Sequence, residues 1–187
     1  KILNDLFPED IAHEIVSTGK ISYRSRRAVV LHLDLCSYTE MVSKMEPMEV
    51  AKLIHTLFSK FDLCVGRAHR VFKIDTIGDA YVCAGWVTDT TERVVCKSMV
   101  RLAKQLLETV KTQSKEWKID LRCRIGVALG TCGAGAVGKL QPRYHIIGQA
   151  MESAKQLEGA AMEQSIHVGD SVRAAISGFG EFIFDFE

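Results

Sequence analysis

The chain has 187 residues, of which 47% are hydrophobic and 25% are charged, a composition typical of one globular domain with its own core. Its formal net charge of +1 gives no electrostatic basis for binding nucleic acid or an anionic membrane. No apolar run approaches the roughly 20 residues that a transmembrane helix needs, and the N-terminal residues lack the pattern of a signal peptide. Because the chain does not begin with Met, we interpret it as a single domain, 1–187, excised from a longer protein.

Hydrophobic spacing and turn residues predict a series of helices and strands. In chain order these are a helix (about 5–17), a strand (28–34), a helix (about 47–61), strands at 69–75 and 79–86, a helix (94–110), a strand (121–130), a glycine-rich hairpin (130–138), a strand (143–147), a helix (about 149–161), a strand (165–169), a helix (about 170–177) and a last strand (181–186). Residues 1–26 are interpreted as an opening helix and a linker from an upstream region. There is no internal repeat and no low-complexity segment.

This order predicts an α+β fold with a ferredoxin-like βαββαβ core, in which a mixed, largely antiparallel sheet carries helices on one face. The layout alone serves RNA-recognition domains, polymerase palms and nucleotide cyclases, so it does not decide the function. An RNA-recognition domain stacks bases on exposed aromatic side chains. The strand LRCRIGVAL (121–129) has no aromatic residue, and nucleic acid is therefore not an expected partner.

Six cysteines are present, and no two have C-x₂-C spacing. Most of them fall in apolar strand or helix patterns. We expect reduced, largely buried thiols in an intracellular compartment, and no zinc site. They are Cys36, Cys64, Cys83, Cys96, Cys123 and Cys132.

Two aspartates are the most informative residues. Asp34 closes the strand pattern in LHLDLCSYTEM, and Asp79 lies in the turn of FKIDTIGDAYV. Two carboxylates at strand ends can cap turns separately, or they can meet and bind a divalent cation. Paired carboxylates with open positions are how two-metal phosphoryl chemistry is built.

The segments around these aspartates resemble the class III nucleotidyl cyclase catalytic domains, over about residues 3–185. The similar segments are LHLDLCSYTEMV, VFKIDTIGDAYVCAGW, RCRIGVALGTCGAGAVG and PRYHIIGQAMESAKQLE, in this order. Domains of this family work as head-to-tail dimers, with the active site between two catalytic domains.

The resemblance implies that Asp34 and Asp79 hold two Mg²⁺ (or Mn²⁺) ions, with the backbone carbonyl of Leu35 as a further ligand. It also implies a catalytic, phosphate-contacting role for Arg124. The turn before the next helix would bind phosphates through its backbone N–H groups, and it consists of Cys36, Ser37, Tyr38 and Thr39. Most family members have Gly where Ser37 stands. A serine costs little conformational free energy there if its φ is negative.

The chain departs from the family on the predicted helix at 149–161. Glu152 and Gln156 stand where the family has an Asn that orients the ribose and an Arg that stabilises charge at the α-phosphate. A carboxylate repels a triphosphate, and an amide cannot replace a bidentate guanidinium. Lys155 projects about 100° away from Gln156 on a helix and is a poor substitute. A lysine that contacts the triphosphate from near the C-terminus has no counterpart before Glu187, which truncation could explain.

The two positions that read the base are also unusual. Asp75 and His145 stand where guanylate cyclases usually have Glu and Cys, and adenylate cyclases Lys and Asp. In a head-to-tail dimer they belong to the same degenerate pocket as Glu152 and Gln156, so they say little about the nucleotide. The sequence around TIGDAYV resembles guanylate cyclases more than adenylate cyclases, which favours GTP over ATP.

These observations predict the metal-donating subunit of a heterodimeric nucleotidyl cyclase that makes cyclic GMP and pyrophosphate, inactive or nearly so alone. The alternatives are a regulatory pseudo-cyclase, a subunit of an adenylate cyclase making cyclic AMP, and a self-sufficient homodimer. The opening segment resembles the stretch that joins cyclase domains to an upstream coiled-coil or membrane sensor. We therefore expect the domain on the cytoplasmic side of a larger protein, with anchoring of that protein in a membrane as one alternative.

Overall fold

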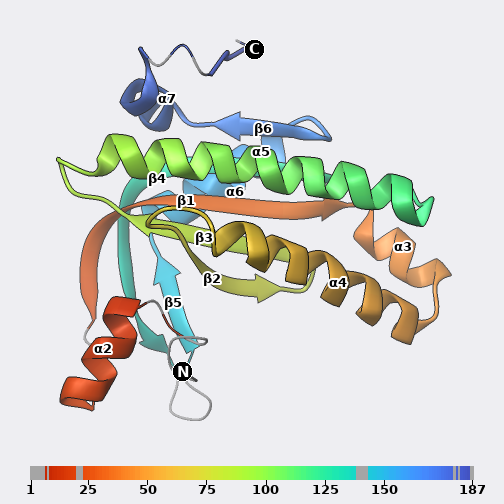
Figure 1. Cartoon of the computed structure of the whole chain (residues 1–187), viewed down its shortest axis with the longest axis horizontal. Coiled ribbons are helices and arrows are strands. Elements are labelled where there is room, and N and C mark those ends of the chain that lie inside the picture. Colours follow the sequence, from red (N-terminus) through yellow and green to blue (C-terminus); the bar gives the residue numbers. More distant parts are fainter. Residues whose placement is uncertain are drawn as a thin grey trace.

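A computed structural model of the chain describes residues 7, 9–19, 23–137, 143–178, 180 and 182–185. It has the predicted α+β architecture, in which the strands form one sheet and the helices pack around it (Figure 1). The elements are α2 (Glu9–Thr18), β1 (Arg24–Cys36), α3 (Tyr38–Lys44), α4 (Pro47–Val65), β2 (Phe72–Ile77), β3 (Ala80–Trp86), α5 (Glu92–Trp117), β4 (Arg122–Val137), β5 (Arg143–Ile147), α6 (Gln149–Ala160), β6 (Ser165–Val168) and α7 (Asp170–Ile176).

The strands form one mixed sheet in the order β2-β3-β1-β4-β5, and β6 pairs in parallel with β4. The other pairings are antiparallel. The longest of them joins β1 to β4 over 13 residue pairs, from Arg24 opposite Ala134 to Cys36 opposite Arg122. Strands β2 and β5, at the two ends of this order, also contact each other, so the sheet is strongly curled.

Helices cover both faces of the sheet, and the expectation of helices on one face alone was wrong. Alternate residues of β1 explain the difference, because Val29, Leu31 and Leu33 are buried with α4, α5 and α7, whereas Ala28 and Val30 are buried with α2 and α6. A central strand that is apolar on both sides needs a cover on both sides. Figure 1 shows α4 and α5 on the near side of the strands and α6 behind them.

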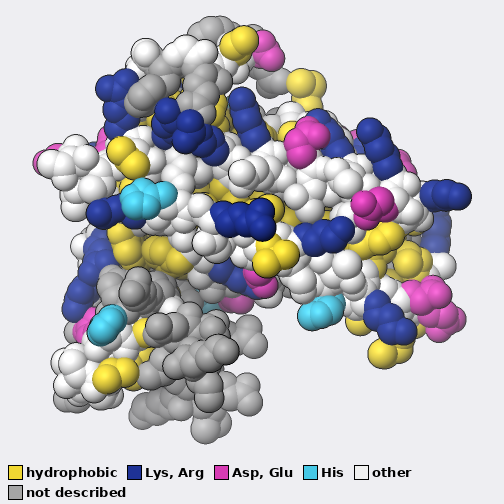
Figure 2. All heavy atoms as spheres, viewed as in Figure 1, with side chains coloured by type: hydrophobic (Ala, Val, Ile, Leu, Met, Phe, Trp, Pro, Cys, Tyr) yellow, Lys and Arg dark blue, Asp and Glu magenta, His cyan; other side chains and the backbone are white. Residues whose placement is uncertain are grey.

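The two long helices follow the sequence pattern. Helix α4 begins with Pro47 in its first turn and buries Val50, Leu57, Phe58 and Phe61. Figure 2 shows that the outer side of α4 and α5 carries Lys and Arg side chains interspersed with Asp and Glu, as expected for exposed helix faces. Within the described part of the chain, no helix combines the length and the hydropathy needed to cross a membrane.

Two predicted elements differ in the structure. The glycine-rich hairpin predicted at 130–138 is wrong for residues 130–137, because β4 continues without a break to Val137, and residue 138 lies outside the described residues. Its glycines make room for neighbours: a Cβ on Gly135 would lie 2.4 Å from the Tyr23 ring. The predicted last strand, 181–186, is wrong for residues 182–185, which are not in a strand, while residues 181 and 186 lie outside the described residues. The apolar alternation there reflects packing of Phe182 and Phe184 on the core under α5 and α7.

The opening helix was expected at about 5–17. The structure describes α2 from Glu9 to Thr18, and residues 5, 6 and 8 of the expected helix lie outside the described residues. The helix ends at Gly19, whose φ of 70° is left-handed and whose N–H donates to the carbonyl of Ile15 at 2.9 Å. An ion pair between Arg24 and Glu14, at 2.8 Å, ties α2 to the start of β1.

Helix α6 approaches β4 so closely that residue 126 has no space for a side chain. A Cβ on Gly126 would lie 2.0 Å from the carbonyl oxygen of Ala154 and 2.4 Å from the nitrogen of Glu158. Both are backbone atoms, so the clash cannot be relieved by turning a side chain. Helix α6 therefore keeps its position only while residue 126 is glycine.

We expect Gly126→Ala to lower the free energy of unfolding by at least about 2 kcal/mol, because α6 must move away from the sheet. Gly159→Ala is the matched control, since a Cβ there meets nothing within 4 Å. This control should raise stability by up to about 1 kcal/mol, as alanine favours the helix. Urea unfolding of both variants decides the matter, and equal stabilities would contradict the described packing of α6.

Candidate functional site

The structure brings Asp34 and Asp79 together, which is one of the two alternatives that their places at strand ends left open. Asp34 lies near the end of β1, and Asp79 lies in the turn between β2 and β3, directly after Gly78 with φ of 64°. Because Leu33 pairs with Tyr81, the start of β3 falls beside the end of β1. The two carboxyl groups are close enough for the protonated Asp34 to hydrogen-bond to Asp79.

The electrostatics of this pair disfavour two negative charges. Burial raises the pKa of Asp34 to about 6, the charges of Asp79 and Glu158 add to the rise, and Arg124 opposes it. The Asp34 side chain is only 28% exposed. A divalent cation would relieve this repulsion, which makes the pair a suitable metal cradle.

Arg124 reaches the same corner from the neighbouring strand. It pairs with Asp34 in the β1–β4 ladder, and its Nη2 lies 3.7 Å from Oδ2 of Asp34. Its Nε donates a hydrogen bond to Oε1 of Glu158 on α6, at 2.9 Å. Arg124 thus lies between two carboxylates and is not an isolated surface arginine.

Sequence reasoning missed Glu158 and His32, which complete this corner. Both are buried, and Nδ1 of His32 lies 3.7 Å from Oε2 of Glu158. Burial and the charge of Lys155 lower the pKa of His32 to about 4, although Glu152 opposes this, so the imidazole is neutral near pH 7. A signal existed, because Glu158 continues the buried row of Ala150 and Ala154 at intervals of four residues.

The predicted phosphate-binding turn has a different backbone from the one expected. Ser37 precedes α3 with φ of 58° and ψ of 22°, a left-handed conformation, whereas a negative φ was the condition for a harmless serine. A non-glycine residue pays roughly 1 kcal/mol or more for this conformation. The neighbouring residues stay close to Asp34, because Cys36 ends β1 and Tyr38 begins α3.

The two residues that replace the Asn–Arg pair lie on the outer side of α6. Glu152 and Gln156 are exposed and one helical turn apart. Nζ of Lys155 is 3.5 Å from Glu152, so this lysine partly compensates the carboxylate. Gln156 lines a polar pocket with Ser153 and Asp170, beside the start of α7.

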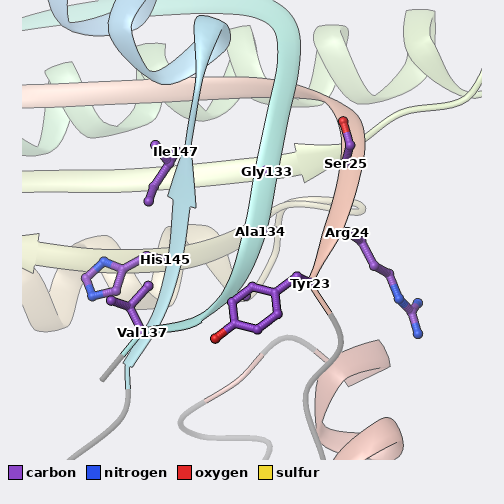
Figure 3. Close-up of a pocket in the computed structure, with 9 residues that line it drawn as sticks. Tyr23, Arg24, Ser25, Gly133, Ala134, Val137, His145 and Ile147 are labelled. Atoms are coloured by element: carbon purple, nitrogen blue, oxygen red, sulfur yellow. The ribbon is translucent and has the colours of Figure 1, made fainter. Parts of the chain in front are cut away.

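The two predicted base-reading residues come from strands that contact each other in the curled sheet, β2 and β5. Asp75 follows a register shift in β2 and accepts a hydrogen bond from the N–H of Thr76 at 2.8 Å. His145 lines an apolar pocket of about 360 Å³ (Figure 3). In this pocket the ring of Tyr23 extends toward Val137, while Arg24 points away from the strands.

We call the place where Asp34, Asp79 and Arg124 meet the metal corner. A divalent cation fits its chemistry, although the protein supplies few ligands. Among the described residues, no group of three or more His, Cys, Asp or Glu side chains is arranged to hold a metal. Asp34 and Asp79 offer hard oxygen donors, which Mg²⁺ and Mn²⁺ prefer. Mg²⁺ is commonly bound by one or two carboxylates, with water and substrate phosphates as the other ligands.

Comparison with known proteins identifies the family of the chain. Residues 21–187 match the model of a family described as the adenylate and guanylate cyclase catalytic domain. The chain is 28% identical over 184 residues to retinal guanylyl cyclase 1 of Bos taurus and 27% identical over 176 residues to the receptor-type guanylate cyclase gcy-23 of Caenorhabditis elegans. These alignments cover 97% and 92% of this chain, but only 16% of each relative.

Solved structures share the fold. The guanylate cyclase domain of RhGC from Catenaria anguillulae, in complex with GTP, has a TM-score of 0.74 at 24% identity, over 83% of this chain and 85% of that one. The adenylyl cyclase CyaB from P. aeruginosa has a TM-score of 0.77 at 18% identity, over 83% and 82%. The chain belongs to the adenylate and guanylate cyclase catalytic domain family, and its fold is that of the class III cyclases.

The raised pKa of Asp34 predicts how stability depends on pH without divalent cations. Because about 6 lies above the ordinary value of 3.8, the folded state binds more protons than the unfolded state between these values. Stability should therefore fall as the pH rises through this window. Asp34→Asn should stabilise the protein at pH 7 by on the order of 2 kcal/mol, and the gain should vanish below about pH 4.

Urea unfolding in EDTA at several pH values measures this gain. Asp89→Asn is the control, because this aspartate is exposed in the segment between β3 and α5. A loss of stability for Asp34→Asn at pH 7 would show that the two carboxylates do not repel each other.

Proposed function

We propose that this domain is the metal-binding half of a heterodimeric nucleotidyl cyclase that converts GTP to cyclic GMP and pyrophosphate. The observation that carries the proposal is the Asp34–Asp79 pair, half-buried and mutually repelling at the end of the sheet. The family match supports the class of reaction, and the names of the similar curated proteins, which are guanylate cyclases, support GTP.

In the proposed reaction, the ribose 3′-oxygen bonds to the α-phosphorus, the bond from this phosphorus to the β-phosphate oxygen breaks, and the 3′-hydroxyl proton is lost to water. Two Mg²⁺ or Mn²⁺ ions would stabilise the 3′-oxyanion and the leaving pyrophosphate. Asp34, Asp79 and the carbonyl of Leu35 hold these ions in the proposal. The guanidinium of Arg124, 3.7 Å from Asp34, donates hydrogen bonds to phosphate oxygens.

The need for a partner rests on the outer side of α6. Glu152 and Gln156 cannot supply the charge stabilisation of an Asn–Arg pair. In the proposal, a second cyclase domain supplies the Asn and the Arg in a head-to-tail heterodimer. The base of the nucleotide is then read by the partner as well, and not by Asp75 and His145. A regulatory pseudo-cyclase is the second candidate, favoured by the same two substitutions.

The setting of the domain is also a proposal. The chain spans 16% of the length of the curated relatives named above, one of which is a receptor-type guanylate cyclase. We place the domain on the cytoplasmic side of a larger protein, with α2 leading from an upstream coiled-coil or membrane sensor.

The isolated domain should show little or no cyclase activity with Mg²⁺ or Mn²⁺ and either GTP or ATP. The reason is the missing Asn–Arg pair, since losing even one oxyanion-stabilising donor costs about 10²–10³ in rate. Product formation by the purified protein alone, measured by chromatography, tests this. Robust turnover would mean that the domain is a self-sufficient homodimer.

A mixture with a cyclase domain that retains the Asn–Arg helix should be active, and this activity should depend on Asp34 and Asp79. Asp34→Ala or Asp79→Ala should abolish it while circular dichroism shows a folded domain. Glu152→Ala and Gln156→Ala should leave it within about twofold, because they face the degenerate pocket. A mixture that stays inactive while the two domains demonstrably bind each other would favour the pseudo-cyclase.

A further inference from the structure

Arg124 is shared unequally between two carboxylates. Its Nε is 2.9 Å from Oε1 of Glu158, whereas its Nη2 is 3.7 Å from Oδ2 of Asp34. The first contact is a charge-assisted hydrogen bond, and the second is only a close ion pair. The guanidinium is therefore drawn toward α6 and away from the end of β1.

The position of Glu158 is set by the backbone and not by a flexible surface contact. Its own nitrogen lies so close to β4 that a Cβ on residue 126 would approach it to 2.4 Å. Its side chain is only 9% exposed, and its second oxygen faces Nδ1 of the neutral His32 at 3.7 Å. A buried carboxylate requires a positive partner, and the guanidinium of Arg124 supplies it.

The position of the Arg124 guanidinium also matters for Asp34. An arginine keeps its charge at all relevant pH values, so it cannot withdraw from a metal site by losing a proton. If Arg124 moved fully onto Asp34, it would form an ion pair that competes with a divalent cation for the same oxygens. Glu158 prevents this move by binding Nε.

We propose that Glu158 is a positioning residue, which holds Arg124 against α6 and thereby keeps Asp34 available to a divalent cation. This inference rests on the proposed metal site at Asp34 and Asp79. It assigns to the inner side of α6 a role in the domain's own site, separate from the degenerate outer side that carries Glu152 and Gln156.

The test is Mn²⁺ binding to the whole 187-residue domain, measured by isothermal titration calorimetry and by the electron paramagnetic resonance signal of free Mn²⁺. Glu158→Gln should weaken binding by about tenfold, the lower end of the range for changes in groups that orient metal ligands. Glu158→Asp keeps the charge but shortens the reach to Arg124, so it should also weaken binding. Glu108→Gln is the control, because it removes an exposed acid on α5, and it should change binding by less than twofold.

A double-mutant cycle separates positioning from a simple loss of negative charge near the metal. If Glu158 acts through Arg124, Glu158→Gln should have no further effect in an Arg124→Gln background. If it acts only by its charge, the tenfold loss should persist there, and the inference would be overturned. The double variant leaves neither charge buried alone, so it should fold. If Glu158→Gln alone does not fold, Glu158→Asp replaces it as the single variant.

The proposed function and this inference fail in different ways. If the wild-type protein binds no Mn²⁺, or binds it no more tightly than Asp34→Ala does, the metal site itself is overturned and the inference with it. Binding that depends on Asp34 but is unchanged in Glu158→Gln and Glu158→Asp would overturn the inference alone.

Discussion

The close contact between α6 and β4 is the constraint on which the rest of the site depends. At Gly126 the helix backbone touches the strand, and this contact fixes both sides of α6 at once. Its inner side delivers Glu158 to Arg124 and so shapes the surroundings of Asp34. Its outer side presents Glu152 and Gln156 to whatever docks there. In the proposed dimer, one helix would thus take part in two half-sites. The two sets of residues are still linked electrostatically, because the charges of Lys155 and Glu152 shift the pKa of His32 beside Glu158.

The metal corner shows how a fold can hold an unfavourable arrangement. The β1–β4 ladder and the β2–β3 turn place two carboxylates together whatever their charge, and burial of Asp34 adds to the cost. The core, which extends from α4 and α5 through β1, provides the stability that tolerates this cost. Binding sites are commonly built in this way, with local strain offset elsewhere in the structure. The left-handed Ser37 directly after β1 is a second local cost at the same corner.

Much of the fold was predictable from the sequence, because periodicity reports burial. The apolar face of α4 and the strand around Val30 follow directly from spacing. Glycine was harder to interpret, since it serves tight turns and close packing equally well, and Gly126 and Gly135 serve packing. The places of Asp34 and Asp79 at strand ends left open whether they cap turns separately or meet, and only the family resemblance implied that they meet. The link from Glu158 to Arg124 was not predictable, because it joins residues 34 positions apart and depends on how closely α6 approaches the sheet.

The length of β4 has a mechanical consequence. Its 16 residues run from Arg122 to Val137 and have a contour of roughly 50 Å. Arg124, near its start, lies beside the metal corner, and Val137, at its end, lines the apolar pocket near α2. Over most of this length it is bonded to β1, and a slip of one residue would turn every buried side chain to the wrong face. The two strands therefore form one stiff ribbon. A force applied where α2 joins the sheet can reach Asp34 only by bending or twisting this ribbon, and not by sliding one strand past the other.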